Sequence, residues 1–383
     1  MSFGWGTVPI GDVATPVERP EPPLPGVVYR QIGVRLWGEG AYERESMDGA
    51  DTKYKTLNRV ESNDIIVNKI WARNGSVSVV NETLAGCYCS GEFPLFRPNP
   101  DELDPLWFYW ITKTRWFWTR CDEKSRGTSG KNRIKPHQFL EINIPLPPLD
   151  EQRRIVARIE SLVLKIDEAK RLRQAIQIDA RAMLRSAFQQ VIEGSEYRAM
   201  GEVAPIVRRA VEIEPDGEYP ELGVRSFGKG VFHKPTLIGA ELDWQKLYRI
   251  HAGDLVISNI KAWEEAIAVA DENDHNRVGS HRYITCVAED GVITANFLCF
   301  YLLMDEGLQR VQVASPGSAD RNRTLAMNRL KKIEVPVPDY GKQLWFNRLQ
   351  TYVDTIAQAQ ADNQTELNAL LPAILDQAFK GKL

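Results

Sequence analysis

Residues 144–166 read IPLPPLDEQRRIVARIESLVLKI, and residues 335–356 read VPVPDYGKQLWFNRLQTYVDTI. In both segments prolines end a short apolar stretch, and apolar residues then recur every three or four positions. Proline cannot continue a strand or helix but is tolerated where a new helix begins. The spacing is typical of a helix that packs along a partner helix. Each segment therefore predicts the start of a long helix, the first one capped by Asp150.

The likeness of these two segments is one part of a repeat that runs through the chain. At an offset of 190 residues, GDVA at 11–14 corresponds to GEVA at 201–204, and SRGTSGKNR at 125–133 corresponds to SPGSADRNR at 315–323. After one inserted residue the offset is 191, which aligns the two proline segments and matches Gln152 with Gln343. Chance does not hold a register through so many separated blocks, so the sequence predicts two copies of one unit.

Each copy has the same internal order. Short runs such as DIIVNKI at 64–70 and DLVISNI at 254–260 predict strands. The aromatic-rich segments 106–118 and 297–304 follow and predict helices, and a basic loop, the prolines and a long helix complete the copy. The stretch TPVERPEPPLPG at 15–26 contains too many prolines for regular structure and predicts an irregular connecting arm.

The two long helices are expected to pack against each other. The second extends from Gly341 to Phe379, with a kink expected at Pro372. Two copies of one unit tend to associate about a two-fold axis, which makes the helices antiparallel. A helical dimerisation stalk is the alternative that this pattern leaves open. The residues expected in the helix–helix contact are Ile155, Ile159, Leu162, Ile166, Val353, Leu367 and Ile374, with Ala169, Ile176, Ala180, Met183 and Ala187 continuing the first series.

The expected fold class is α+β, with two mixed α/β domains in a pseudo-two-fold arrangement, separated by two long antiparallel helices that form a coiled-coil-like spacer. The domains are placed at 1–149 and 195–340, and the helical regions at 150–194 and 341–383. A chain of 383 residues is long enough for this organisation. No apolar stretch is long enough to span a membrane, and the N-terminus does not resemble a signal peptide, so a cytoplasmic location is expected.

No residue pattern predicts catalysis or a bound metal. SGKN at 129–132 lacks the first glycine and the hydroxyl residue of a phosphate-binding loop. Glu168 and Lys170 have the spacing of a nuclease motif but lie in the first long helix, where a solvated face is the simpler interpretation. The five cysteines form no CxxC pair, and the five histidines show no ligand spacing. The chain is therefore expected to be non-catalytic.

The net charge is −3, so a nucleic-acid contact would need locally concentrated positive charge. Basic residues outnumber acidic ones in 110–135 and again in 308–332, at matched positions in the two copies. A solvated charged loop explains one such cluster, whereas two matched clusters in an acidic chain favour phosphate contact. The expected phosphate contacts are Arg126, Thr128, Lys131, Asn132, Arg133, Lys135, Ser318, Arg321, Asn322 and Arg323. Base reading is expected where the copies differ, with Arg73, Asn74, Lys261 and Trp263 as candidates.

At this point the sequence resembles the specificity subunit of Type I restriction–modification systems. The resemblance is carried by IPLPPLDEQ at 144–152, Gly127-Thr128, GDLV at 253–256 and ILDQAFKGKL at 374–383, and it covers the whole chain. The second copy departs from the pattern, because DYGKQ at 339–343 lacks the Leu and Glu of the first.

The resemblance implies that the two mixed domains are target recognition domains, each reading one half of a split, asymmetric site in double-stranded DNA. The helical regions would set the gap between the halves. The implied partners are two methyltransferase (modification) subunits and, through them, restriction–translocation subunits. S-adenosylmethionine, ATP and magnesium would be bound by those partners and not by this chain. Two alternatives stay open: a recognition subunit of a methylation-only or other phage-defence complex, and a coiled-coil scaffold that binds protein.

Overall fold

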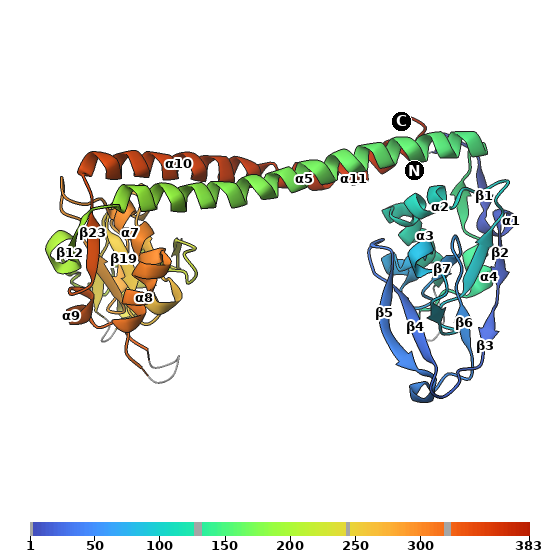
Figure 1. Ribbon diagram of the computed structural model, residues 1–383, viewed down its shortest axis with the longest axis horizontal. Helices are drawn as coiled ribbons and strands as arrows, with labels where there is room; N and C mark the ends of the chain where they lie inside the picture. Colours follow the sequence, from blue (N-terminus) through green and yellow to red (C-terminus); the bar gives the residue numbers. More distant parts are fainter. Residues whose placement is uncertain (1–2, 126–131, 243–245, 318–322) are drawn as a thin grey trace. The chain divides into compact units, whose positions relative to one another are not determined.

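The computed structural model describes residues 3–125, 132–242, 246–317 and 323–383. By contacts, the chain divides into two compact units: unit 1 is Met1–Arg173 with Ala361–Leu383, and unit 2 is Gln174–Gln360. This division passes through the long helices, so each unit contains one mixed α/β lobe and two helical segments (Figure 1). The four-part division expected from the sequence stays a prediction.

Among the described residues of the unit 1 lobe, the strands pair antiparallel except for a parallel contact between Gln31 and Tyr88. Strand order is β1-β11 in one small sheet, β2-β10-β7-β8 in a second and β3-β6-β9-β4-β5 in a third. The strands are β1 (Thr7–Pro9), β2 (Ala14–Val17), β3 (Pro20–Glu21), β4 (Val28–Val34), β5 (Ala41–Asp48), β6 (Leu57–Arg59), β7 (Ile65–Val67), β8 (Val77–Val79), β9 (Tyr88–Cys89), β10 (Leu95–Pro98) and β11 (Asn143–Pro145). The helices of the lobe are α1 (Ile10–Val13), α2 (Pro105–Thr112), α3 (Arg115–Ser125) and α4 (Pro136–Leu140), with the 3-10 turns η1 (Gly49–Asp51), η2 (Ala72–Asn74) and η3 (Glu82–Leu84).

Unit 2 repeats this order. Its sheets are β12-β23, β13-β18-β21, β14-β17, β15-β16 and β20-β19-β22. The strands are β12 (Glu196–Ala199), β13 (Arg209–Ala210), β14 (Glu218–Tyr219), β15 (Leu222–Val224), β16 (Val231–His233), β17 (Leu237–Ile238), β18 (Leu247–Arg249), β19 (Leu255–Ser258), β20 (Ile267–Val269), β21 (Val278–Ser280), β22 (Tyr283–Cys286) and β23 (Glu334–Val337). The helices are α6 (Met200–Val203), α7 (Ala295–Leu303), α8 (Asp305–Val313) and α9 (Met327–Leu330), with the 3-10 turns η4 (Gly239–Glu241), η5 (Ala262–Glu264) and η6 (Glu272–Asp274).

Strand pairing confirms that the two units are copies. Ile65 pairs with Val79 in unit 1, and Leu255 pairs with Val269 in unit 2. The partners in the second pair are the residues 190 positions further along the chain, and other strand pairs follow the same rule. Register within a sheet decides which side chains face the core. The repeat in the sequence therefore reflects a repeated core.

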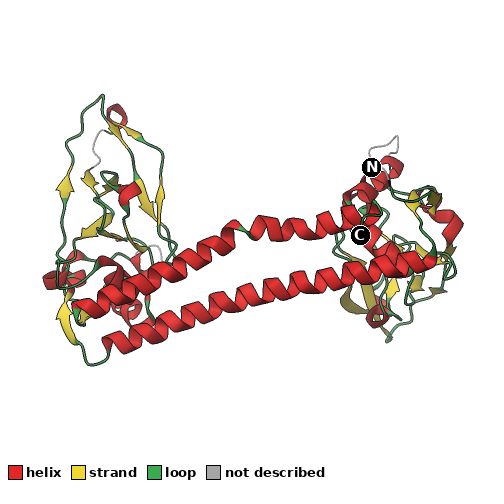
Figure 2. Ribbon diagram, turned by 90° about the horizontal axis from the view of Figure 1, so that it is seen from above, coloured by secondary structure: helices red, strands yellow, loops and turns green. Residues whose placement is uncertain are grey.

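The long helices run antiparallel within each unit, as expected (Figure 2). They are α5 (Leu149–Ile192), α10 (Tyr340–Asp362) and α11 (Gln364–Phe379). In unit 1, α5 packs on α11, and the Arg154 guanidinium donates to the Leu383 carbonyl at 3.0 Å. In unit 2, α5 packs on α10: the amide of Gln177 donates to Gln360 at 3.2 Å, and the rings of Phe188 and Phe346 lie 5.3 Å apart.

Two details of the predicted helices were wrong. The second helix is interrupted at Asn363, in an exposed polar stretch, instead of running unbroken to Phe379. Pro372 lies inside α11 near Leu371 and Ile374, which pack on the core of unit 1, and the kink expected there stays a prediction. The first helix begins at Leu149, and the Gln152 N–H donates to the Pro148 carbonyl at 3.0 Å. Asp150 therefore lies in the first turn and does not cap it.

The segment 15–26 is not an irregular arm. Residues 14–17 form β2 and residues 20–21 form β3, both at the edge of a sheet. An edge strand has backbone groups without a strand partner, so a proline that lacks an N–H is tolerated there. The prediction of an irregular arm, which rested on proline content alone, was therefore wrong.

Apolar residues of α5 are buried mainly where the helix lies on a lobe. Ile155 and Ile159 are fully buried in the core of unit 1, and Ile166 is also buried. Ile176 and Met183, which were expected in the helix–helix contact, are exposed. Near the end of α5, the residues that pack into the core of unit 2 are Leu184, Ala187, Phe188 and Val191. Leu162, Val353 and Ile374 are half-buried, and Leu367 is buried.

Two buried thiols, at positions that do not correspond in the two copies, report on the two units separately. Burial raises the pKa of Cys89 in unit 1 to about 12, and it raises the pKa of Cys286 in unit 2 to about 12. The thiolate is the reactive form. At pH 8 we expect iodoacetamide to modify either thiol only when its unit opens, whereas urea-unfolded protein reacts at once. Rapid modification of the folded chain, followed by peptide mass spectrometry, would contradict this burial.

Candidate nucleic-acid interface

The four base-reading candidates lie in two matched turns. Arg73 and Asn74 belong to η2, between β7 and β8. Lys261 is the N-cap residue of η5, and Trp263 lies within that turn, between β19 and β20. Both turns end in a left-handed residue, which is Gly75 in unit 1 and Glu265 in unit 2. The structure therefore brings the candidates together pairwise, at the same end of the same sheet in each lobe.

A hairpin tip that the sequence analysis did not assign docks on each turn. In unit 1 the tip joins β4 to β5, and the Trp37 N–H donates to the Asn74 carbonyl at 2.6 Å. In unit 2 the corresponding tip joins β15 to β16, and the Phe227 N–H donates to the Glu264 carbonyl at 2.7 Å. The matched Trp37-Gly38 and Phe227-Gly228 pairs were the sequence signal for this contact. We call each hairpin tip (residues 36–40 or 226–230) with its turn (71–75 or 261–265) a tip–turn surface.

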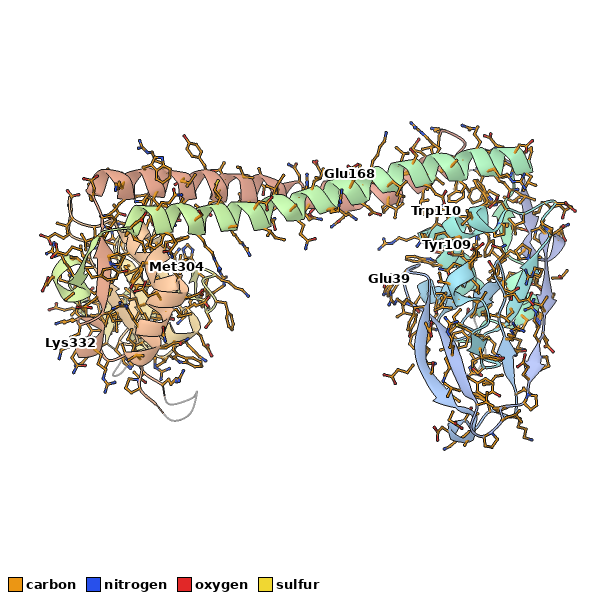
Figure 3. All side chains as sticks on the ribbon, viewed as in Figure 1. Glu39, Tyr109, Trp110, Glu168, Met304 and Lys332 are labelled. Carbon is orange, nitrogen blue, oxygen red and sulfur yellow. The ribbon has the colours of Figure 1, made fainter. Side chains whose placement is uncertain are left out.

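The tip–turn surface of unit 1 borders a cavity of about 410 Å³. Glu39 of the tip and Tyr109 of α2 both line this cavity, and Figure 3 shows them on the same side of the lobe. Lys113, at the end of α2, donates to the Gly38 carbonyl at 2.8 Å and lies 4.4 Å from the centre of the Tyr109 ring. Lys113 thus supports the tip as well as adding positive charge beside it.

Of the four phosphate candidates that the structure describes, Arg323 reaches a tip–turn surface. Its guanidinium lies 5.2 Å from the centre of the Trp263 ring, and the ammonium of Lys261 lies 5.3 Å from the same ring. Attraction between a cation and the face of an aromatic ring favours this arrangement. The segment is held because the Leu325 N–H donates to the Asn259 carbonyl at 2.7 Å. Unit 2 therefore presents two cations around one tryptophan.

Arg133, the residue of unit 1 that corresponds to Arg323, contacts an acidic residue instead of an aromatic ring. Arg133 forms an ion pair with Glu92 at 3.3 Å, and Lys69 lies 4.0 Å from the same carboxylate. Asn132 is half-buried, and Lys135 is exposed as the N-cap residue of α4. The other six phosphate candidates lie outside the described residues: Arg126, Thr128, Lys131, Ser318, Arg321 and Asn322.

Several cations in the basic windows are paired with acids. Lys124 pairs with Glu141 at 2.7 Å, and Arg120 pairs with Glu123 at 2.8 Å. Arg310 pairs with Glu306 at 3.0 Å. Glu141 lies outside the window that was counted in the sequence, so the count overstated the charge available to a ligand.

In each unit a buried carboxylate directly precedes the strand that leads into the tip–turn surface. Asp64 precedes β7 and accepts hydrogen bonds from Arg19 at 2.8 Å and from the Glu61 N–H at 2.8 Å. Asp254 precedes β19 and accepts from Arg209 at 2.7 Å and from the His251 N–H at 2.8 Å. Asp64 also pairs with Arg97 at 2.7 Å. The Asp that repeats in the sequence therefore links the strand that leads into the turn to Arg19, between β2 and β3, in unit 1 and to Arg209 of β13 in unit 2.

A buried glutamine joins each lobe to its long helix. The Gln343 side chain accepts from the Thr294 N–H at 3.0 Å and donates to the carbonyls of Val292 and Pro338, both at 2.9 Å. Gln152 makes the matching three bonds, with the Asp104 N–H at 2.9 Å, the Glu102 carbonyl at 2.7 Å and the Pro147 carbonyl at 2.9 Å. The second helix start thus keeps the glutamine contacts although it lacks the Leu and Glu of the first.

Comparison with known proteins agrees with this architecture. Residues 4–177 match the family described as Type I restriction modification DNA specificity domain. The StySPI specificity subunit of a Type I restriction enzyme, from Salmonella potsdam, is 22% identical over an alignment that covers 99% of this chain and 89% of the relative.

Two solved structures share the fold. The HsdS subunit from Thermoanaerobacter tengcongensis aligns with a TM-score of 0.67 and 23% identity over 99% of this chain and 97% of that one. A chain from a structure on complex assembly and conformational transition of the type I R-M system aligns with a TM-score of 0.71 and 21% identity over the full length of both. Residues 4–177 therefore belong to the Type I restriction modification DNA specificity domain family. The chain as a whole is similar to Type I specificity subunits and shares their fold.

Among the described residues, no helix combines the length and the apolar character needed to cross a bilayer.

Proposed function

We propose that this chain reads a split, asymmetric site in double-stranded DNA, with one tip–turn surface for each half. The observation that supports this most strongly is that the tip–turn surfaces of the two units share one backbone conformation but carry different side chains. Trp71 and Arg73 of unit 1 correspond to Lys261 and Trp263 of unit 2, so cation and aromatic exchange places. Base edges are distinguished by the hydrogen-bonding and apolar groups that face them. Two identical readers would recognise a palindrome, whereas these two would recognise different sequences.

We propose that partner subunits, and not this chain, catalyse the methylation and restriction reactions. This chain would dock two methyltransferase subunits and, through them, the restriction–translocation subunits, in the cytoplasm of a prokaryote. S-adenosylmethionine, ATP and magnesium would then be bound by the partners. Support comes from the match of residues 4–177 to the Type I DNA specificity domain family and from the similarity of the chain to a Type I specificity subunit.

The target duplex can be identified before binding is measured. Single-molecule sequencing of modified bases, in cells with and without this gene, should give a split motif that is modified only when the gene is present. A duplex with that motif and one with a scrambled motif then serve as the specific and non-specific probes.

Arg323→Ala is expected to weaken binding of both duplexes, because a phosphate contact carries no sequence information. Loss of one phosphate contact should make the slope of log K against log salt concentration shallower by about 0.9. Arg133→Ala should have a smaller effect, because Glu92 already neutralises Arg133 in part. Fluorescence anisotropy titrations over a range of salt concentrations measure both quantities. Wild-type affinity and slope in both variants would refute the assignment of these phosphate contacts.

A further inference from the structure

The hairpin tips hold an exposed aromatic residue in a strained backbone conformation. The φ angle is 58° at Trp37 and 63° at Phe227, in the left-handed region. A bulky side chain there is a conformational outlier that is energetically costly and persists only where its surroundings enforce it. The side chains remain 57% and 66% exposed, so burial of the ring does not offset this cost.

The surroundings that enforce the conformation are the docked turns. Besides the bonds of Trp37 and Phe227, the Gly38 N–H donates to the Gly75 carbonyl at 3.1 Å, and the Gly228 N–H donates to the Glu265 carbonyl at 3.2 Å. Two left-handed segments thus meet in each unit. This geometry is the same in both copies although most of the side chains around it differ. An aromatic residue is present at the strained position both times.

Cations lie near the exposed ring in unit 2, and one of them, Lys261, is paired with Glu264 at 2.9 Å. The ammonium of Lys229 lies 5.7 Å from the centre of the Phe227 ring, on the same hairpin tip. Lys261 and Arg323 lie around Trp263 of the turn on which the tip docks. In unit 1, Arg73 lies 6.0 Å from the centre of the exposed Trp71 ring. A ligand that matches this pattern has anionic groups around stacked apolar faces, which describes a DNA duplex better than a protein surface.

We propose that Phe227, and at the matched position Trp37, inserts as a wedge at a base-pair step of its half-site. This inference rests on the proposed reading of DNA by the tip–turn surfaces. Apolar side chains inserted between base pairs unstack a step and bend the duplex. A ring that is already held in place loses little conformational freedom on binding. Flexible pyrimidine–purine steps are the easiest to open, so the wedge would also favour particular sequences.

The Phe227→Gly variant distinguishes insertion at a base-pair step from a purely structural role of Phe227. Glycine adopts a positive φ without strain, so unit 2 should stay at least as resistant to iodoacetamide at Cys286 as the wild-type chain. Affinity for the specific duplex should fall about tenfold or more, as expected for the loss of one stacked ring. The salt dependence should not change, because no charge is lost. Phe227→Trp should bind within about threefold of wild type, because it keeps an aromatic ring of comparable stacking energy.

The test uses the full-length chain co-expressed with its methyltransferase. The probe is the split-motif duplex with 2-aminopurine placed in turn at each step of the half-sites, since this base fluoresces more strongly when unstacked. Wild type and Phe227→Trp should raise the fluorescence at one step in each half-site. Phe227→Gly should lose the signal in one half-site, and Trp37→Gly should lose it in the other half-site only.

Three results would overturn the proposal. The first is wild-type affinity and fluorescence in Phe227→Gly. The second is a faster reaction of Cys286 in that variant, which would indicate a structural role. The third is loss of the methyltransferase from the purified complex with DNA affinity retained, which would indicate a protein contact. If Arg323→Ala weakens DNA binding while Phe227→Gly does not, the wedge fails and the proposed function stands. If neither variant affects DNA binding, the proposed function fails as well.

Discussion

Replacing Gln343 by leucine is expected to raise the rate of iodoacetamide reaction at Cys286 by more than about a hundredfold. The substitution leaves the Thr294 N–H and the carbonyls of Val292 and Pro338 buried without their partner. Each unsatisfied buried group costs about 1–3 kcal/mol, so the three together cost about 3 kcal/mol or more. Since every 1.4 kcal/mol changes an equilibrium about tenfold, opening of unit 2 should become much more frequent.

The repeat supplies the matched experiment. Gln152→Leu should accelerate the reaction of Cys89 in unit 1 in the same way, and each variant should affect its own unit more than the other. Gln177→Leu is the control, because Gln177 is an exposed residue of the same helix as Gln152. An unchanged rate at Cys286 in Gln343→Leu would show that these hydrogen bonds do not hold the lobe on its helix.

The second large effect is expected from the buried carboxylates. Asp254→Asn removes the charge that pairs with Arg209 and should destabilise unit 2 by about 3 kcal/mol, because breaking a buried ion pair leaves its partner uncompensated. Asp64→Asn should cost unit 1 no more than this, because Arg19 and Arg97 both keep Glu61 as a partner, at 3.0 Å and 2.6 Å. The readout is hydrogen exchange at the amides of β19 and β7, each followed by mass spectrometry.

An exposed ion pair provides the comparison for these variants. Glu43 pairs with Arg30 at the surface of unit 1, and exposed pairs contribute little to stability. Glu43→Gln should therefore leave exchange in β7 unchanged. If Asp64→Asn behaved like Glu43→Gln, the buried carboxylate would be no more important than a surface charge.

The repeat could be predicted from the sequence because it rests on local and periodic features. Apolar residues at the strand positions of 65–67 and 255–257, glycines at the turns and prolines before the helices occur in the same order in both copies. These features act within a few residues of one another, so their spacing survives in the sequence. The same holds for α2, α3 and α7, where the aromatic segments form helices as expected.

Two sequence predictions, the irregular proline arm and part of the helix seam, were wrong because neighbouring elements decide whether these residues form strands or become buried. Pro16 and Pro20 lie in strands because edge positions of two sheets were available for them. Ile176 is exposed although it continues the apolar period of α5, because no lobe covers that part of the helix. Periodicity records which residues can be buried, and packing decides which of them are.

The sequence by itself determined that one unit occurs twice, where each long helix begins, and which residues the two copies share, including the Asp and Gln now seen to be buried. Only the tertiary structure decided which cations are paired, because Glu92 and Glu141 reach Arg133 and Lys124 across many residues. It also decided that the hairpin tip meets the turn, since Trp37 and Asn74 join through backbone atoms. Backbone hydrogen bonds do not depend on side-chain identity, so a single sequence carries almost no trace of them.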